Sequence, residues 1–332
     1  MKNNIAENPK IILIGSVNSS RKTLEKLIEH QLNVVAVLGL HPDGATNVSG
    51  YFDLKELSEN NHIPFQYFTK VNDKAIIDFV QSKSPDLVFV VGLSQMIREG
   101  LLAIPKYGLI GYHPTRLPEG RGRGAIAWII LGKVQGAASF FKMDEGMDSG
   151  SIWSQMNYDV GENDDATSAV QQILRAIDKA LDAVLPDLKK GIFITTPQDE
   201  SKATYLGKRN PEDGMIDWKQ SATSIHQLIR ATTTPLPGAY SYIGSRKIVI
   251  LQASISEITN HLGVVGRVVI ADSNLGIHVQ TGDGLLKIEK VAGIEIDTLK
   301  VGNTLGFNFE KEYFDVLSRI ETIENQLKNG RK

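Results

Sequence analysis

The sequence has no cysteine, and each of its other shortages excludes a class of protein. Without cysteine the chain has no disulfide, no thiolate nucleophile and no cysteine metal ligand. Its formal net charge is only -2, so no strong positive field attracts a nucleic-acid backbone. Its apolar runs are far shorter than a membrane span, and its N-terminal segment has no hydrophobic signal region. These absences predict a cytoplasmic protein with neither a membrane nor a nucleic-acid partner.

The composition that remains is that of a globular protein with more than one domain. The chain has 332 residues, of which 42% are apolar and 22% charged, and this length favours two domains. Between residues 195 and 213 the composition shifts to proline, glycine and charge, which indicates a boundary. We therefore predict an α/β domain over residues 1–200 and a smaller β domain with a terminal helix over residues 201–332.

Strand-like and helix-like segments alternate in the first domain. Short β-branched runs fit buried parallel strands, and the alternation predicts a mostly parallel sheet with helices on both faces. The predicted strands are Ile11–Gly15, Val34–Leu38, Leu87–Val91, Leu109–Tyr112, Ala137–Met143 and Ile152–Tyr158. The predicted helices are Arg21–Gln31 with Ser20 as N-cap, Asp53–Asn60, Asn72–Lys83, Ala125–Leu131 and Asp164–Lys190.

The second domain reads as a set of short strands separated by glycine-containing turns. Such spacing predicts a small β-barrel. The predicted strands are Tyr240–Ile243, Lys247–Leu251, Gly263–Ala271, Gly276–Gln280 and Leu285–Val291, after a helix at Ser221–Thr232 and before a terminal helix at Phe309–Gln326.

The most informative segment is Gly108–Gly150, which supplies His113 and Asp148 in glycine-rich surroundings. His113 follows a predicted parallel strand, and ligands bind at the carboxyl ends of such strands. A carboxylate near an imidazole orients it and stabilises its cation, and it can also act as a base. The alternative is a surface histidine and a turn aspartate that do not meet, and spacing alone does not decide between the two.

Three arginines lie in the same segment, at Arg116, Arg121 and Arg123. Cations in a glycine-rich loop can bind a phosphate or carboxylate, although composition alone favours a solvated loop. The turn Gly15–Lys22 lacks the G-x-G-x-x-G and P-loop patterns, so a plain strand-to-helix connection is the simpler interpretation. The remaining histidines have no metal-ligand spacing, and no metal site is predicted.

These motifs resemble a known family. GYHPTRLPEGRGRGAIAW, from Gly111, is similar to the N-x-H-(P/G)-S-L-L-P…RG…W signature of the formyltransferases that depend on N10-formyltetrahydrofolate. KMDEGMDSG, from Lys142, resembles the family's second signature, in which the last aspartate of DEG-x-D-(T/S)-G is catalytic. The resemblance covers roughly residues 9–300, and it implies a Rossmann-like N-terminal domain followed by a C-terminal domain with an OB-like barrel. Motifs in the second half are similar to enzymes that formylate amino sugars on nucleotide or lipid carriers.

The resemblance implies formyl transfer from N10-formyltetrahydrofolate, a donor co-substrate, to the amine of a small acceptor. His113 would stabilise the oxyanion or shuttle a proton, and Asp148 would raise the pKa of His113 and help to deprotonate the amine. Arg116, Arg121 and Arg123 would line the acceptor entrance. The folate would contact the loops that contain Gly92, Leu93, Ser94, Gln95, Met96, Ile97, Asp144, Glu145 and Gly146.

One residue departs from the family pattern. The family's catalytic asparagine, two residues before the histidine, corresponds to Gly111. Loss of one oxyanion donor typically costs about 10²–10³ in rate. Another group replaces the donor, or Gly111 widens the site for another acceptor, or the protein only binds folate or a nucleotide sugar. We favour the first two, because His113 and Asp148 are both present.

The acceptor is not named by the sequence. Methionyl-tRNA is the alternative acceptor in this family, and an enzyme for it needs a basic surface near the active site. The loop His41–Gly50 has no lysine or arginine, so a small molecule fits better. The β domain leaves a homodimer open.

Overall fold

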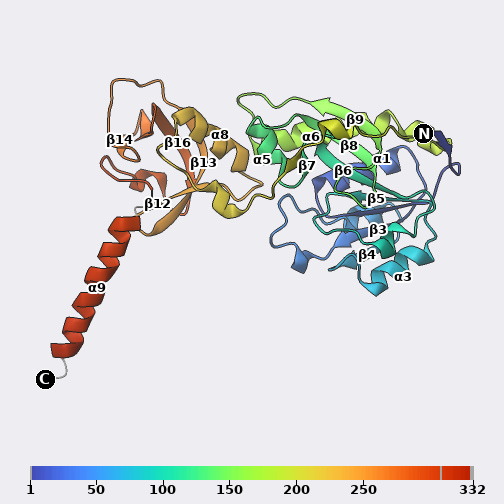
Figure 1. Ribbon diagram of the computed structural model, residues 1–332, viewed down its shortest axis with the longest axis horizontal. Coiled ribbons are helices and arrows are strands. Elements are labelled where there is room, and N and C mark those ends of the chain that lie inside the picture. Colours follow the sequence, from blue (N-terminus) through green and yellow to red (C-terminus); the bar gives the residue numbers. More distant parts are fainter. Residues whose placement is uncertain (1, 307–308, 330–332) are drawn as a thin grey trace. The chain divides into compact units, whose positions relative to one another are not determined.

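The computed structural model describes residues 2–306 and 309–329 (Figure 1). It divides into two compact units, Met1–Arg209 and Asn210–Lys332, each of which is described by itself. The division lies after Arg209 and not after residue 200. The reason is that the short strand β11 (Tyr205–Leu206) pairs with β7 (Arg121–Gly122) and so belongs to the first unit.

The first unit is built on a seven-stranded, mostly parallel sheet in the order β4-β3-β2-β5-β6-β8-β9. Pairing is parallel from β4 to β6 and antiparallel at β8 and β9. Strands β3 and β5 lie on opposite sides of β2, so the strand order reverses there, which is where open α/β sheets bind ligands. The strands are β2 (Ile11–Gly15), β3 (Val34–Leu40), β4 (Phe65–Phe68), β5 (Leu87–Val91), β6 (Leu109–Thr115), β8 (Gly136–Lys142) and β9 (Ile152–Tyr158).

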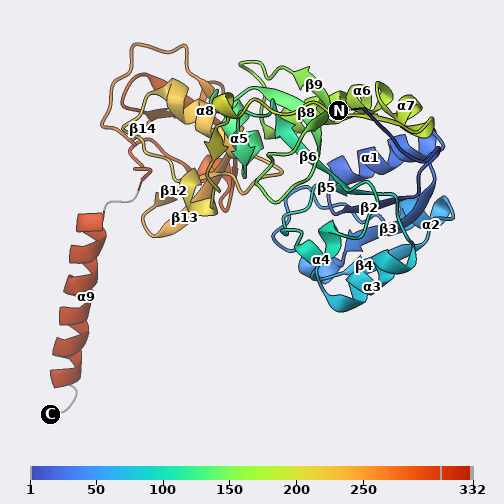
Figure 2. The ribbon, with the colours of Figure 1, turned by 45° about the vertical axis from the view of Figure 1, so that its right-hand side comes forward.

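Each face of this sheet has its own apolar core. Because side chains alternate along a strand, Ile11 and Leu13 enter one core while Ile12 and Ile14 enter the other. Helices α1 and α6 cover the first face and α3 the second (Figure 2). The helices are α1 (Asn18–Glu29), α2 (Lys55–Asn60), α3 (Lys74–Ser82), α4 (Glu99–Leu102), α5 (Ala125–Ile130), α6 (Ala166–Asp182) and α7 (Leu185–Lys189).

Short elements complete both units. Strand β1 (Lys2–Asn4) pairs with β10 (Ile192–Ile194) in the first unit. The 3-10 helices are Pro42–Gly44 and Glu200–Lys202 in the first unit, and Pro211–Gly214 and Ile296–Thr298 in the second.

Three local predictions for the first unit were wrong. The segment predicted as one helix over Asp164–Lys190 is broken into α6 and α7, because Pro186 has no N–H to continue the helical ladder. Val17, not Ser20, is the N-cap of α1. Strand β6 runs on to Thr115, so His113 lies within the strand instead of after it.

The second unit packs one helix on a five-stranded antiparallel sheet in the order β12-β13-β16-β15-β14. The Ser221 hydroxyl accepts the Ser224 N–H and caps this helix. Within the described residues, β12 and β14 lie at opposite ends of the strand order and do not pair with each other, so an OB-like barrel stays a prediction. The elements are α8 (Ala222–Thr232), β12 (Ala239–Ile243), β13 (Arg246–Ile255), β14 (Val268–Asp272), β15 (Gly276–Gln280) and β16 (Leu285–Ala292).

The chain ends in the predicted terminal helix, α9 (Phe309–Asn329). No helix among the residues described combines the length and apolar character needed to cross a bilayer.

Candidate active site

His113 and Asp148 come together in the first unit. His113 lies in β6, and Asp148 lies in the turn that connects β8 to β9. The His113 Nδ1 and Asp148 Oδ2 atoms are 3.5 Å apart. The His113 side chain is 8% exposed and that of Asp148 is 21% exposed, so the pair lies where a ligand can reach its edge. The alternative in which the two residues do not meet is therefore wrong.

The backbone of the following loop fixes the proton on His113. Its Nε2 atom lies 2.8 Å from the Gly120 carbonyl oxygen, which can only accept a hydrogen bond. The hydrogen of a neutral ring therefore sits on Nε2, and Nδ1 presents a lone pair on the side of Asp148. The imidazole is thus arranged to take up a proton at Nδ1.

Burial determines the charge of His113 in the protein without bound ligands. It lowers the pKa of His113 below the ordinary 6.5, while the Asp148 carboxylate and the Gly120 carbonyl act in the opposite direction. The upward effect expected of Asp148 is present, but burial outweighs it. His113 is therefore neutral at neutral pH and has two partners in place for its cation.

Asp148 is held in an uncommon backbone conformation. Its φ is +52°, a region that aspartate adopts more readily than most residues. Its Oδ2 accepts the Gly122 N–H at 2.8 Å. Gly122 itself has a φ of +114°, and a Cβ there would lie 2.6 Å from the Leu206 carbonyl oxygen, so a glycine is required. The Asp148 carboxylate is thus held by a hydrogen bond from the loop that contains Arg121 and Arg123.

Arg121 lies inside this loop and is not a free cation. Its side chain is only 1% exposed, and it donates to both carboxylate oxygens of Glu200, which lowers the pKa of Glu200. It also donates to Gln198 Oε1, while Gln198 Nε2 donates to the carbonyls of Asp148 and Gly150. Arg121 therefore reaches the Asp148 turn through Gln198.

The other two predicted arginines are exposed. Arg116 Nη1 donates to Gln135 Oε1, and Arg123 follows the short strand β7. Both can present charge to an anionic ligand, whereas the charge of Arg121 is already neutralised by Glu200.

Gly111 lies in β6 between its parallel neighbour Val90 and its antiparallel neighbour Phe141. A Cβ at this position would lie 2.8 Å from Phe141 Cζ and 3.0 Å from Met143 Cγ. Apolar side chains thus occupy the space into which a side chain at this position would extend. An asparagine would therefore not fit at position 111 without movement of Phe141 and Met143.

The loop predicted to hold folate follows β5 and is open to solvent at its tip. Met96 is 77% exposed, and Ile97 is buried. Gln95 anchors the loop, because its side chain donates to the Thr69 carbonyl and accepts the Val71 N–H. Gly92 has a φ of +63°, and its carbonyl accepts the Ser16 hydroxyl, which joins the loop to the end of β2.

A pocket of about 530 Å³ opens beside this loop, and His113 and Asp148 are not among its lining residues. It is lined by Lys70, Asn72, Asp73, Gln95, Met96 and Arg98.

The second predicted folate segment is an exposed turn. Asp144 Oδ1 accepts the Gly146 N–H and the Ser149 hydroxyl, which closes the turn on itself. Glu145 and Gly146 are also exposed, and the turn leads directly to Asp148.

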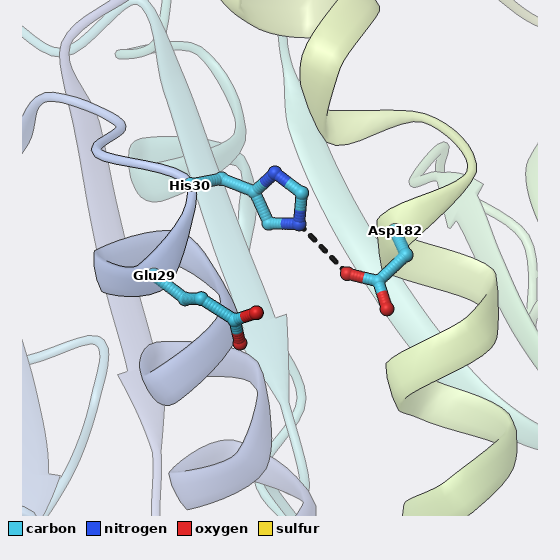
Figure 3. A group of neighbouring side chains, drawn as sticks. All are labelled: Glu29, His30 and Asp182. Carbon is cyan, nitrogen blue, oxygen red and sulfur yellow. Dashed lines mark hydrogen bonds and ion pairs between the residues drawn. The ribbon is translucent and has the colours of Figure 1, made fainter.

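A cluster of titratable groups lies elsewhere, between α1 and α6 (Figure 3). Glu29, His30 and Asp182 bring their ligand-type atoms within 4.8 Å of one another. Lys26 donates to both carboxylates, and His30 Nε2 lies 2.7 Å from Asp182 Oδ1. The lysine ammonium already occupies the centre of the cluster, so we interpret it as an ion-pair network that joins the two helices.

Sequence reasoning missed the groups that hold the pair. The Gly120 carbonyl and the Gly122 N–H are backbone groups that no motif reveals. Gln198 and Glu200 lie in the segment interpreted as an interdomain boundary, and its charge and proline content concealed their contacts.

Comparisons with known proteins identify the family to which the fold belongs. Open α/β sheets bind ligands outside the carboxyl ends of their strands, and a histidine paired with an aspartate there is a candidate for acid–base chemistry. The model of the formyl transferase family matches residues 9–185, and that of the formyl transferase C-terminal domain matches residues 208–303. The chain belongs to the formyl transferase family.

Solved structures of several formyltransferases share the fold. HypX from Aquifex aeolicus, in complex with tetrahydrofolic acid, matches with a TM-score of 0.63 at 18% identity, over 87% of this chain and 45% of that chain. WlaRD, a sugar 3N-formyl transferase, was solved with dTDP and 5-N-formyl-THF and matches with a TM-score of 0.60 at 17% identity, over 87% and 100%. The N-formyltransferase from Helicobacter canadensis was solved with folinic acid and dTDP-3-aminofucose. It matches with a TM-score of 0.57 at 18% identity, over 89% of this chain and 99% of that chain. The chain spans less than half of HypX, and at these identities the likeness shows the fold alone.

Proposed function

We propose that this protein transfers the formyl group of N10-formyltetrahydrofolate to the amine of a small acceptor, an amino sugar on a nucleotide or lipid carrier. The observation that carries the proposal is the buried, neutral His113 between Asp148 and the Gly120 carbonyl. The two sugar formyltransferase structures, which the chain matches over nearly their whole length, support the acceptor class.

The chain's residues supply the proton chemistry. The folate supplies an activated formyl carbon. Nδ1 of neutral His113 accepts a proton from the attacking amine, because its Nε2 is already committed to Gly120. The imidazolium formed is then stabilised by the Asp148 carboxylate and the Gly120 carbonyl oxygen. Because Gly111 has no side-chain donor, this imidazolium is the group that offsets the negative charge developing on the formyl oxygen. As the bond between the formyl carbon and N10 breaks, His113 returns its proton to N10, which leaves a formylated amine, tetrahydrofolate and neutral His113.

The residues around the pocket fit the chemistry of a folate. Lys70 and Arg98 are cations that complement carboxylates, while Met96 offers an apolar surface for a ring. We place the donor on Gly92–Ile97 and Asp144–Gly146, and the acceptor beside Arg116 and Arg123. The ion pair between Arg121 and Glu200 then holds in place the loop that contains Arg116 and Arg123.

A mass-spectrometric screen tests the proposal. Purified protein is incubated with N10-formyltetrahydrofolate and a panel of amino-sugar nucleotides, other amines and methionyl-tRNA. We expect a formylated amino sugar whose formation is lost in His113→Ala and Asp148→Asn. Formylated methionyl-tRNA as the only product would overturn the acceptor class, and an unchanged turnover in both variants would overturn the site.

One observation favours a second candidate, a folate or nucleotide-sugar binding protein without turnover. Phe141 and Met143 fill the space beside Gly111, so the oxyanion donor is absent and its place is closed. This candidate predicts folate binding by calorimetry and no product with any acceptor of the panel.

Three further features are proposals of the same kind. We propose that the second unit is OB-like, that the protein acts in the cytoplasm, and that the chain associates with further copies of itself.

A further inference from the structure

The terminal helix α9 (red in Figure 1) exposes a row of large apolar side chains. Exposed apolar side chains in a continuous row mark an interaction surface. Six of them are each at least 47% exposed: Phe309, Tyr313, Val316, Ile320, Ile323 and Leu327.

The spacing of this row is that of a coiled coil. Successive members are four, three, four, three and four residues apart, which is a heptad repeat with apolar residues at every a and d position. A helix that packs on its own globular domain shows a wider apolar face, whereas a seam confined to a and d matches a partner helix. Two further exposed apolar side chains of α9 lie outside the a and d positions: Leu317, at e and beside the seam, is 38% exposed, and Phe314, at b, is 66% exposed.

We propose that α9 forms a parallel coiled coil with α9 of further copies of this chain. The flanking charges select this partner and this direction. Arg319 occupies a g position and Glu324 the e position five residues later, and in a parallel coiled coil these two positions face each other across neighbouring helices. In the antiparallel arrangement that keeps the same seam, g positions face each other, so Arg319 would lie opposite Arg319. Opposite charges therefore favour self-association in parallel.

The residues at the a and d positions also indicate how many helices the coiled coil contains. The d positions include the β-branched Val316 and Ile323, and the a positions include Ile320 and Leu327. This arrangement favours more than two helices over a dimer. Because the seam spans less than three heptads, we expect the assembly to dissociate on dilution.

Sedimentation of the full chain over a range of concentrations tests the proposal first. We expect a mass that is a multiple of the 36.5 kDa protomer at high concentration, and its value gives the number of strands. Ile320→Glu places a charge in the seam and should give a monomer at every concentration. Ser318→Glu places the same charge on the opposite side of α9 and should leave the mass unchanged. A wild-type protein that stays monomeric, or equal masses in the two variants, overturns the proposal.

A charge exchange and a crosslink test the direction. Arg319→Glu and Glu324→Arg should each weaken association about tenfold, while the double variant should restore it. Packing of α9 on its own chain or on an unrelated protein predicts no such restoration. Because the chain has no cysteine, Ile320→Cys is a single-site reporter that should form an intermolecular disulfide on oxidation, with Ser318→Cys as the matched control. Failure of both the restoration and the crosslink would overturn the parallel arrangement. None of these measurements depends on formyl transfer.

Discussion

Two loops at the edge of the first unit's sheet differ in how they are held. The loop over Gly120–Gly124 and the Asp148 turn are tied together by hydrogen bonds, and Arg121 within them is almost fully buried. The loop Gly92–Ile97 is anchored by Gln95 but exposes Met96 at its tip. The difference teaches that the reacting groups are fixed in advance, while the loop predicted to hold the folate is open to it. Changes in the first loop should lower kcat, and changes in the second should raise KM.

The largest expected effect comes from removal of the carboxylate. Asp148→Asn keeps the shape and the Gly122 hydrogen bond but cannot stabilise the imidazolium, so kcat should fall about 10²–10⁴-fold. Steady-state kinetics measure it, and the exposed Asp159→Asn is the control. A kcat within a factor of about two of wild type would remove Asp148 from the chemistry.

Gly111→Asn tests whether the site is damaged or repacked. The new side chain would overlap Phe141 and Met143, so we expect the free energy of unfolding to fall by about 1–3 kcal/mol. Urea denaturation measures this loss. Met143→Ala in the same chain should recover part of the stability, and kcat of the double variant then shows whether a restored donor speeds transfer. Full stability of the single variant would mean that the space is open.

Gln198→Leu breaks the connection between Arg121 and the Asp148 turn. Two hydrogen bonds to backbone carbonyls are lost, so the turn should loosen and kcat should fall about tenfold with KM nearly unchanged. Gln66→Leu, at an exposed site in β4, is the control. A rise in KM with constant kcat would show that Gln198 acts on binding instead of positioning.

The pH dependence follows from the lowered pKa of His113. The unfolded chain takes up the histidine proton near pH 6.5 and the folded chain only below it, so stability falls as the pH drops through this window. His113→Gln should lose less stability on mild acidification than the wild type, by urea denaturation. The acid limb of kcat/KM should likewise have its midpoint below 6.5. A midpoint above 6.5 would show that the Asp148 carboxylate, and not burial, has the larger effect on the pKa of His113.

The smallest effect is expected in the open loop. Gln95→Ala removes the contacts to Thr69 and Val71, so the KM for the folate should rise a few-fold, roughly 3–10, with kcat unchanged. A fall in kcat as large as the rise in KM would mean that the loop Gly92–Ile97 and the loop Gly120–Gly124 are coupled.

The sequence by itself determined the periodic features. Buried β-branched runs such as Leu87–Val91, amphipathic helices and the resemblance of two motifs were enough for the mostly parallel sheet, a second unit of short strands and the formyl transferase family. These features follow from local patterns, because side-chain period and turn chemistry are written along the chain.

Only the tertiary structure decided the contacts at the site. It brought His113 to Asp148, enclosed Arg121 with Glu200 and filled the space beside Gly111 with Phe141 and Met143. These contacts join residues far apart in the chain, and several use backbone groups whose positions depend on strand register. For the same reason burial, which a sequence does not show, and not the nearby carboxylate determines the resting charge of His113.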